Sequence, residues 1–347
     1  MNKHLFTLLL LLHTFFVSSL NAQLFDGLET VLTAQEDTQK LLQGYTSPLA
    51  KSFIYGLNTG WAHTAKTHKQ LGFDLTIGAG LSTAPDSDLT FIPENLNFVD
   101  ADNLILPTVL SNSNAVPIDI TIPANGDLGE LRAAIDFPGG VGGILPVNGV
   151  PIPTIQASVG VILNTDIIVR YVPETNIEGA AVSLNGFGFK HDLTQYLGPI
   201  DNLPVHLSFL AAQTTLSSRY NFESSTLSQN TAADMRYVDF NLKARTIQLL
   251  GSIDFPFISI FGAVGISRGT ANLGMKGVYN LTYNQKVGDF QIPINTSITD
   301  PLNLNYEANS TLTTIGARLN LAFLKIYAQY SLQEYKTLSA GVSLGLR

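Results

Sequence analysis

The chain ends with TLSAGVSLGLR, residues 337–347, in which hydrophobic and small polar residues alternate strictly. One set of alternate positions carries leucine, alanine and valine, and the other carries threonine, serine and glycine. Because successive side chains of a β-strand point to opposite faces, this pattern predicts a strand with one apolar face and one small polar face. A regular strand at a chain end, where most soluble proteins fray, indicates that it pairs with another strand.

Nine further stretches of the chain have the same strand character, and several of them reach ten residues or more, against about five to six in soluble sheets. They are 71–81, 155–163, 165–172, 178–190, 204–216, 237–250, 257–267, 312–322 and 324–333. Their polar faces are rich in glycine, serine and threonine, as in a wet lumen. We therefore predict an all-β fold, a transmembrane antiparallel β-barrel of about 10–14 strands with a short helical N-terminal segment.

The composition agrees with a surface that is not wholly in water. The chain has 347 residues, of which 13% are charged, about half the roughly 25% usual for soluble domains. It has no cysteine, and its net charge of -8 comes with scattered lysines and arginines. This acidic balance argues against a nucleic-acid-binding groove, which needs a clustered basic face.

Three regions follow from the pattern along the chain. Residues 1–22 have a positive start, an apolar stretch and a small residue before the expected cleavage site, which predicts a signal peptide. Residues 23–69 have helical spacing, and we expect two short helices divided before Pro48 that plug the barrel or lie in the periplasm. Residues 70–347 form the predicted barrel in the outer membrane of a Gram-negative bacterium. The candidate plug residues are Trp61, His63 and His68.

The lengths of the connections predict an orientation. Short turns fall mostly on one side of the barrel, whereas the long stretches 82–154 and 268–311 fall on the other and are expected to be extracellular. The first stretch holds extra strands, a surface hairpin or a lid, and the second has room for one more strand pair. The connection 191–203 is long for the short-turn side, and we assign it to a small helix.

A set of charged residues occupies the polar positions of the predicted strands. These lumen-facing candidates are Asp74, Arg170, Asp239, Lys243, Arg245 and Arg318. They could steer a solute through the lumen, or their mixed signs could brace the plug against the wall by pairing. In both hypotheses they avoid lipid, and we expect a charge at Leu319 or Val342 to impair assembly more than one at Asn241 or Ser343.

Catalytic and metal-site patterns are weak. His63 and His68 lie five positions apart, without an HExxH motif or a carboxylate at ligand spacing, so we expect no metal and no cofactor. His206 and Ser208 share a strand face, and an outer-membrane hydrolase would need them within hydrogen-bond reach. Because no G-x-S-x-G context accompanies the serine, we expect no enzyme.

Three stretches, 34–77, 158–173 and 186–198, resemble the DUF6588 family of outer-membrane proteins from Bacteroidetes, which has no established activity. The resemblance extends over nearly the whole chain after the signal peptide and implies the same barrel. An N-terminal plug before a barrel is also similar in architecture to the FadL-type transporters of hydrophobic compounds. That second likeness transfers no binding residue, because the chain has no matching site motif.

The last strand also resembles the β-signal that the barrel-assembly machinery reads, and this resemblance implies that machinery as a partner. Ser339, Gly341, Leu344 and Leu346 match its spacing, although Arg347 stands where the final aromatic residue is usual.

The leading functional prediction is a channel or transporter for a small, hydrophobic solute, with outer-membrane lipid around the wall. A non-transporting barrel that scaffolds a surface or secretion complex would instead have a sealed lumen. An outer-membrane hydrolase and a soluble exported β-sandwich are the two further alternatives.

Overall fold

The computed structural model describes residues 35–101, 103–122, 131–145, 149–177, 179–198, 203–221, 236–287 and 290–346. The predicted signal peptide lies outside the described residues, as does Arg347. Among the described residues, no helix is long and apolar enough to span a bilayer.

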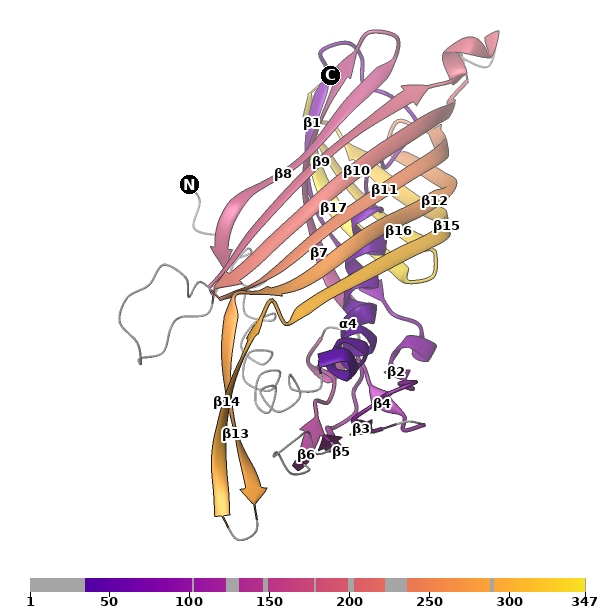
Figure 1. The fold of residues 1–347 in the computed structure, drawn as a ribbon. Helices are drawn as coiled ribbons and strands as arrows, with labels where there is room; N and C mark the ends of the chain where they lie inside the picture. Colours follow the sequence, from indigo (N-terminus) through magenta and orange to yellow (C-terminus); the bar gives the residue numbers. More distant parts are fainter. Residues whose placement is uncertain are drawn as a thin grey trace.

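Ten antiparallel strands form a closed barrel, with the order β1-β17-β16-β15-β12-β11-β10-β9-β8-β7 around the wall (Figure 1). The strands are β1 (Phe73–Thr83), β7 (Gly149–Val161), β8 (Thr165–Ile177), β9 (Ala180–Asp192), β10 (Val205–Asn221), β11 (Tyr237–Asp254), β12 (Ile258–Lys276), β15 (Leu302–Leu321), β16 (Leu324–Leu332) and β17 (Lys336–Leu346). The predicted antiparallel barrel is confirmed, and each of the ten predicted strands lies in its wall.

The last strand closes the barrel by pairing with the first. Phe73 lies opposite Leu346, the antiparallel register runs to Thr83 opposite Lys336, and the other edge of β1 pairs with β7. No strand of the wall is left with an open edge, which a bilayer could not satisfy with hydrogen bonds.

The two faces of the wall differ as the closing strand predicts. Leu338, Val342 and Leu344 are about half exposed on the outside, whereas Ser339 and Ser343 are buried inside. The outward positions of the neighbouring strands are likewise exposed leucine, isoleucine, valine and phenylalanine. This belt of exposed apolar side chains, here called the apolar band, is the surface of a barrel that crosses a lipid bilayer.

The connections divide the barrel into two unlike ends. The turn end has the connections 162–164, 193–204, 255–257 and 322–323, of which the second holds the 3-10 helix η4 (Thr194–Tyr196). The loop end has 84–148, 178–179, 222–236, 277–301 and 333–335. The predicted asymmetry of short and long connections is therefore present.

Two connections of the loop end, 84–148 and 277–301, contain strands outside the barrel wall. The connection 84–148 holds η1 (Asp86–Asp88), β2 (Thr90–Phe91), β3 (Val99–Asp100), β4 (Leu106–Pro107), β5 (Val116–Ile122), β6 (Leu131–Phe137) and η2 (Gly142–Ile144). The other holds the hairpin of β13 (Val278–Val287) and β14 (Phe290–Thr299), which projects away from the wall (Figure 1).

One helix, α4 (Gln35–Leu57), replaces the two short helices expected around Pro48. Proline removes one helical hydrogen bond at a cost of about 3 kcal/mol, so it commonly ends a helix. Here the helix continues because both of its halves are packed. Leu41 and Tyr45 before the proline, and Ile54 after it, are buried in one cluster with the small sheets and the wall.

Candidate functional site: the occupied lumen

The chain that leads from α4 to the first strand passes along the inside of the barrel. We call residues 58–69 the lumen segment. Near its start, Asn58 Nδ2 donates to Ser267 Oγ at 2.8 Å, halfway along β12. At its far end, Leu71 N donates to the carbonyl of Gly160 at the turn end, at 2.9 Å. The N-terminal region therefore enters at the loop end and leaves at the turn end, where β1 begins.

A buried arginine holds the middle of this path. Arg170, on β8, is 1% exposed, and it donates to the carbonyl oxygens of Leu57 and Thr59 at 2.8 Å each. Its Nε donates to Gln156 Oε1 on β7 at 3.1 Å, and its guanidinium lies 3.8 Å from the centre of the Trp61 ring. One wall side chain thus satisfies two backbone carbonyls of the N-terminal region, which water cannot reach.

Two glycines make room for the indole of Trp61. A Cβ atom at Gly186 would lie 3.0 Å from Trp61, and one at Gly188 would lie 3.1 Å from it. Both glycines occupy inward positions of β9, where they alternate with the outward Phe187 and Phe189. The alternating GFGF stretch is therefore the sequence signal for a bulky group inside the barrel, and sequence reasoning missed it.

Charged groups fix the end of the lumen segment. His68 lies between two wall carboxylates, with Nδ1 3.1 Å from Asp166 and Nε2 3.1 Å from Asp74. Both contacts are hydrogen bonds only if both ring nitrogens carry protons, so the geometry selects the imidazolium. Lys190 lies 3.0 Å from the same Asp166 carboxylate and donates to the carbonyl of Lys66 at 2.8 Å.

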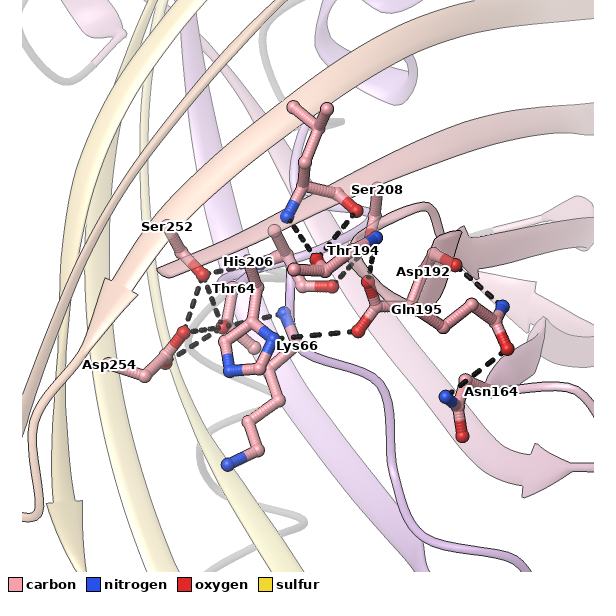
Figure 2. A network of polar contacts seen from close by, with 12 residues as sticks. Thr64, Lys66, Asn164, Asp192, Thr194, Gln195, His206, Ser208, Ser252 and Asp254 are labelled. Atoms are coloured by element: carbon pink, nitrogen blue, oxygen red, sulfur yellow. Dashed lines mark hydrogen bonds and ion pairs between the residues drawn. The ribbon is translucent and has the colours of Figure 1, made fainter. Parts of the chain in front are cut away.

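A hydroxyl network lies beside this cluster (Figure 2). Thr64 donates to Asp254 at 2.9 Å, and Ser252 donates to the same carboxylate at 2.5 Å. The backbone N–H of Ala65 donates to Ser252 Oγ at 3.0 Å. Arg318 Nη2 lies 3.7 Å from Asp254, which ties this network to β15. Neutral hydroxyls and paired charges, rather than isolated charges, therefore hold the segment to the wall.

A second set of polar contacts fixes α4 at the loop end. Lys51 forms ion pairs with Asp88 at 3.1 Å and with Glu334 at 2.9 Å. The hydroxyl of Tyr335 donates to Asp88 at 2.6 Å, and that of Tyr55 donates to Glu334. Burial alone would raise the pKa of Asp88, but the hydrogen bonds from Tyr335 and Lys51 outweigh it and lower that pKa. These contacts join α4 to the connections 84–148 and 333–335.

An open cavity of about 800 Å³ lies below the lumen segment, at the turn end. Its lining includes Lys66, His68, Lys69, Asp254, Arg318 and Lys325. The apolar Phe255, Pro256, Ala322 and Phe323 line this cavity as well, so the vestibule, as we call it, offers both charged and apolar surfaces.

The predicted lumen-facing residues fall into two groups. Asp74, Arg170 and Arg318 are buried inside the barrel, where they contact or border the lumen segment. Lys243 and Arg245 are exposed on the outer face of β11, and Asp239 shares their parity. The expectation for these three is corrected. β11 extends past the apolar band, where its outer face turns polar and its inner face carries apolar residues against α4.

The remaining candidates are placed as follows. Trp61, His63 and His68 all lie in the lumen segment, and the ring of His63 stacks on Tyr327 with centres 3.9 Å apart. Ser208 donates to the carbonyl of Ala65, and Figure 2 shows it among the contacts of the lumen segment. Its neighbour His206 instead lies 3.5 Å from the carboxylate of Asp192. Ser208 therefore contacts the lumen segment, whereas His206 contacts Asp192.

Comparison with known proteins gives a family and several barrels. A model described as "Family of unknown function (DUF6588)" matches residues 1–346. The translocator domain of the autotransporter NalP from Neisseria meningitidis is 11% identical, covering 81% of this chain and 90% of its own, with a TM-score of 0.30. The outer membrane protease OmpT from Escherichia coli is 8% identical, covering 83% and 100%, with a TM-score of 0.26.

The Ralstonia pickettii toluene transporter TbuX is 9% identical, covering 80% of this chain and 90% of its own, with a TM-score of 0.21. No residue role is carried over from these structures. The search of curated proteins found no match.

Proposed function

The chain belongs to the DUF6588 family of unknown function, and from its filled lumen we propose that it is a closed outer-membrane barrel that anchors a surface module. The module consists of α4, the strands β2–β6 and the β13–β14 hairpin at the loop end. The observation that carries this proposal is the occupied lumen. The lumen segment spans the barrel, and Trp61, Ala65, Ile168, Leu210 and Leu250 belong to a buried apolar cluster across its middle.

The size of the barrel supports a closed state. Eight strands enclose an interior that side chains alone can fill, and a ten-stranded barrel is wider, so its lumen needs additional groups to close it. Here α4 is held at the loop end, and the lumen segment is held in the middle and at the turn end, so an opening would have to break several contacts together.

We expect the purified full chain to be electrically silent in a planar lipid bilayer. The measurement is single-channel current in neutral salt, with protein-free detergent as the blank. Steady channels from protein that migrates as a folded, heat-modifiable barrel would contradict the closed state. They would favour the transporter instead.

The loop end is assigned to the cell surface, because barrels of this class place short turns in the periplasm. A cysteine-free chain allows a direct test with single cysteines. Asn112→Cys, exposed at the loop end, should react with a membrane-impermeant maleimide on intact cells. Asn164→Cys, equally exposed at the turn end, should react only after the outer membrane is permeabilised. The reverse pattern would invert the assignment and put the module in the periplasm.

Transport remains the second candidate, and one observation favours it. Several contacts between the lumen segment and the wall are polar, and water could replace these if the segment moved. The vestibule, which both charged and apolar side chains line, would then be the periplasmic exit.

A further inference from the structure

The outer face of the barrel carries a row of four polar side chains just beyond the apolar band. Gln213, Arg245, Arg268 and Asn309 lie directly opposite one another on β10, β11, β12 and β15. All four are exposed. Two arginines are therefore neighbours in the centre of the row, an arrangement in which like charges repel.

The flanking residues orient the two arginines without cancelling their charges. Arg245 Nε donates to Gln213 Oε1 at 2.8 Å, and Arg268 Nε donates to Asn309 Oδ1 at 3.0 Å. Both acceptors are neutral amides, and each bond engages the Nε side of the guanidinium fork. The terminal nitrogens are the groups that bind phosphate oxygens in pairs.

The surroundings of the pair match a lipid headgroup. On the side toward the turn end, the next outward residues are Ile247 and Ile266, which belong to the apolar band. On the other side, Lys243 adds a third exposed cation two positions along β11, while Glu307 is the acid at the same level. An open groove of about 810 Å³ joins these cations to the two isoleucines.

We propose that Arg245, Arg268 and Lys243 bind the phosphate of an anionic lipid in the leaflet at the loop end. The phosphate would lie between the two guanidinium groups and relieve their repulsion, and the acyl chains would cover Ile247 and Ile266. The site belongs to the outer wall, so it is independent of whether the lumen opens. Each basic residue at a membrane surface adds to the attraction for anionic lipids.

The test uses the full chain in a neutral detergent, with phosphatidic acid as the probe and diacylglycerol of the same chain length as the phosphate-free lipid. Native mass spectrometry measures the bound lipid. Arg245→Gln with Arg268→Gln should weaken phosphatidic acid binding by about tenfold or more, because two of the three cations are lost. Arg219→Gln is the matched control. Arg219 is exposed on the same outer face, but it lies opposite Asp239 and over the Tyr237 ring.

Equal binding of phosphatidic acid by the wild type and the double variant would overturn the proposal. So would equal binding of the two lipids by the wild type. Inorganic phosphate is the soluble comparison, and if it displaced the lipid at equal concentration the site would be an anion site rather than a lipid site. In lipid-free neutral detergent, the double variant should be at least as heat-stable as the wild type, since it has lost the repulsion. A clear fall in its melting temperature would instead assign the arginines a structural role.

Discussion

Arg170→Ala is expected to release the lumen segment and to turn a silent barrel into a conducting one. The substitution removes the donors to the carbonyl oxygens of Leu57 and Thr59 and the cation that stacks on Trp61. Charge-assisted hydrogen bonds contribute about 1.5–3 kcal/mol each, and the carbonyls would stay buried without them. We therefore expect the docking of the segment to weaken by about 3–5 kcal/mol, at least a hundredfold in the closed-to-open ratio.

Planar-bilayer current and limited proteolysis measure this release. Arg170→Ala should show frequent openings and faster cleavage near Lys66 and Lys69, which are exposed to the vestibule. Arg219→Ala, on the outer face, is the control and should stay silent. Arg170→Lys should be intermediate, because lysine keeps the charge but lacks the planar fork that reaches both carbonyls.

A designed disulfide separates release of the segment from general damage to the wall. Thr59 and Ser339 have their hydroxyl oxygens 3.4 Å apart, and the chain contains no other cysteine to compete. Thr59→Cys with Ser339→Cys, added to Arg170→Ala, should silence the current when oxidised and restore it when reduced. A current that is the same under oxidising and reducing conditions would show that ions do not pass beside the lumen segment. A silent, protease-resistant Arg170→Ala barrel would contradict the role given to the arginine.

Val342→Lys is expected to prevent most of the protein from inserting. Val342 is exposed in the apolar band and pairs with Ile77 and Ile326, so the lysine would face the middle of the bilayer. A lysine there costs about 2–4 kcal/mol, and we expect the folded, heat-modifiable yield in membranes to fall to about a tenth or less. Leu319, exposed in the same band, should behave alike.

The control is a lysine on the outer face beyond the band. Asn241 is exposed there, between Asp239 and Lys243, and Asn241→Lys should leave the yield unchanged. The sequence predicted that Ser343 would also tolerate a charge, but its side chain is fully buried inside the barrel and a lysine would not fit there. Equal yields for Val342→Lys and Asn241→Lys would contradict the position of the band.

The strands of the wall could be predicted because the bilayer imposes one rule on each of them. Apolar and polar positions alternate wherever lipid lies outside and the lumen inside, so Leu338 to Leu346 reveal both faces. The rule ends where the wall leaves the membrane. The first ten residues of β15 lie in such a region, with Asn303, Asn305 and Glu307 outside, and the pattern there indicated a loop.

The charged residues of β11 were assigned to the wrong face for the same reason, because this part of the strand also lies beyond the membrane. Thr246 and Gln248 face the lumen and are polar, whereas Leu242 and Ala244, which precede them on the same face of β11, are apolar. The parity of the strand is constant, but the chemistry of each face inverts where α4 replaces water inside and water replaces lipid outside. A rule that equates polar with inward therefore fails for Lys243 and its neighbours.

The contacts that hold α4 and the lumen segment could not be predicted from the sequence, for another reason. Lys51, Asp88 and Glu334 come from a helix, a long connection and the last turn, and only the closed barrel brings them together. Trp61, His63 and His68 could be named as plug candidates because they lie in the N-terminal segment that precedes the first predicted strand. Their partners on β1, β8, β9 and β16 depend on register, which alternation does not determine.

The path of the lumen segment restricts the order of assembly. The seam of the wall joins β1 to β17, so it cannot form until the last strand has been made. Residues 58–69 are made before any wall strand, and they end up enclosed. Pulling Trp61 and its neighbours through a finished ring would require the fixed indole pocket at Gly186 and Gly188 to open. We therefore expect the wall strands to assemble around the lumen segment, which would template the closing sheet, before β1 pairs with β17.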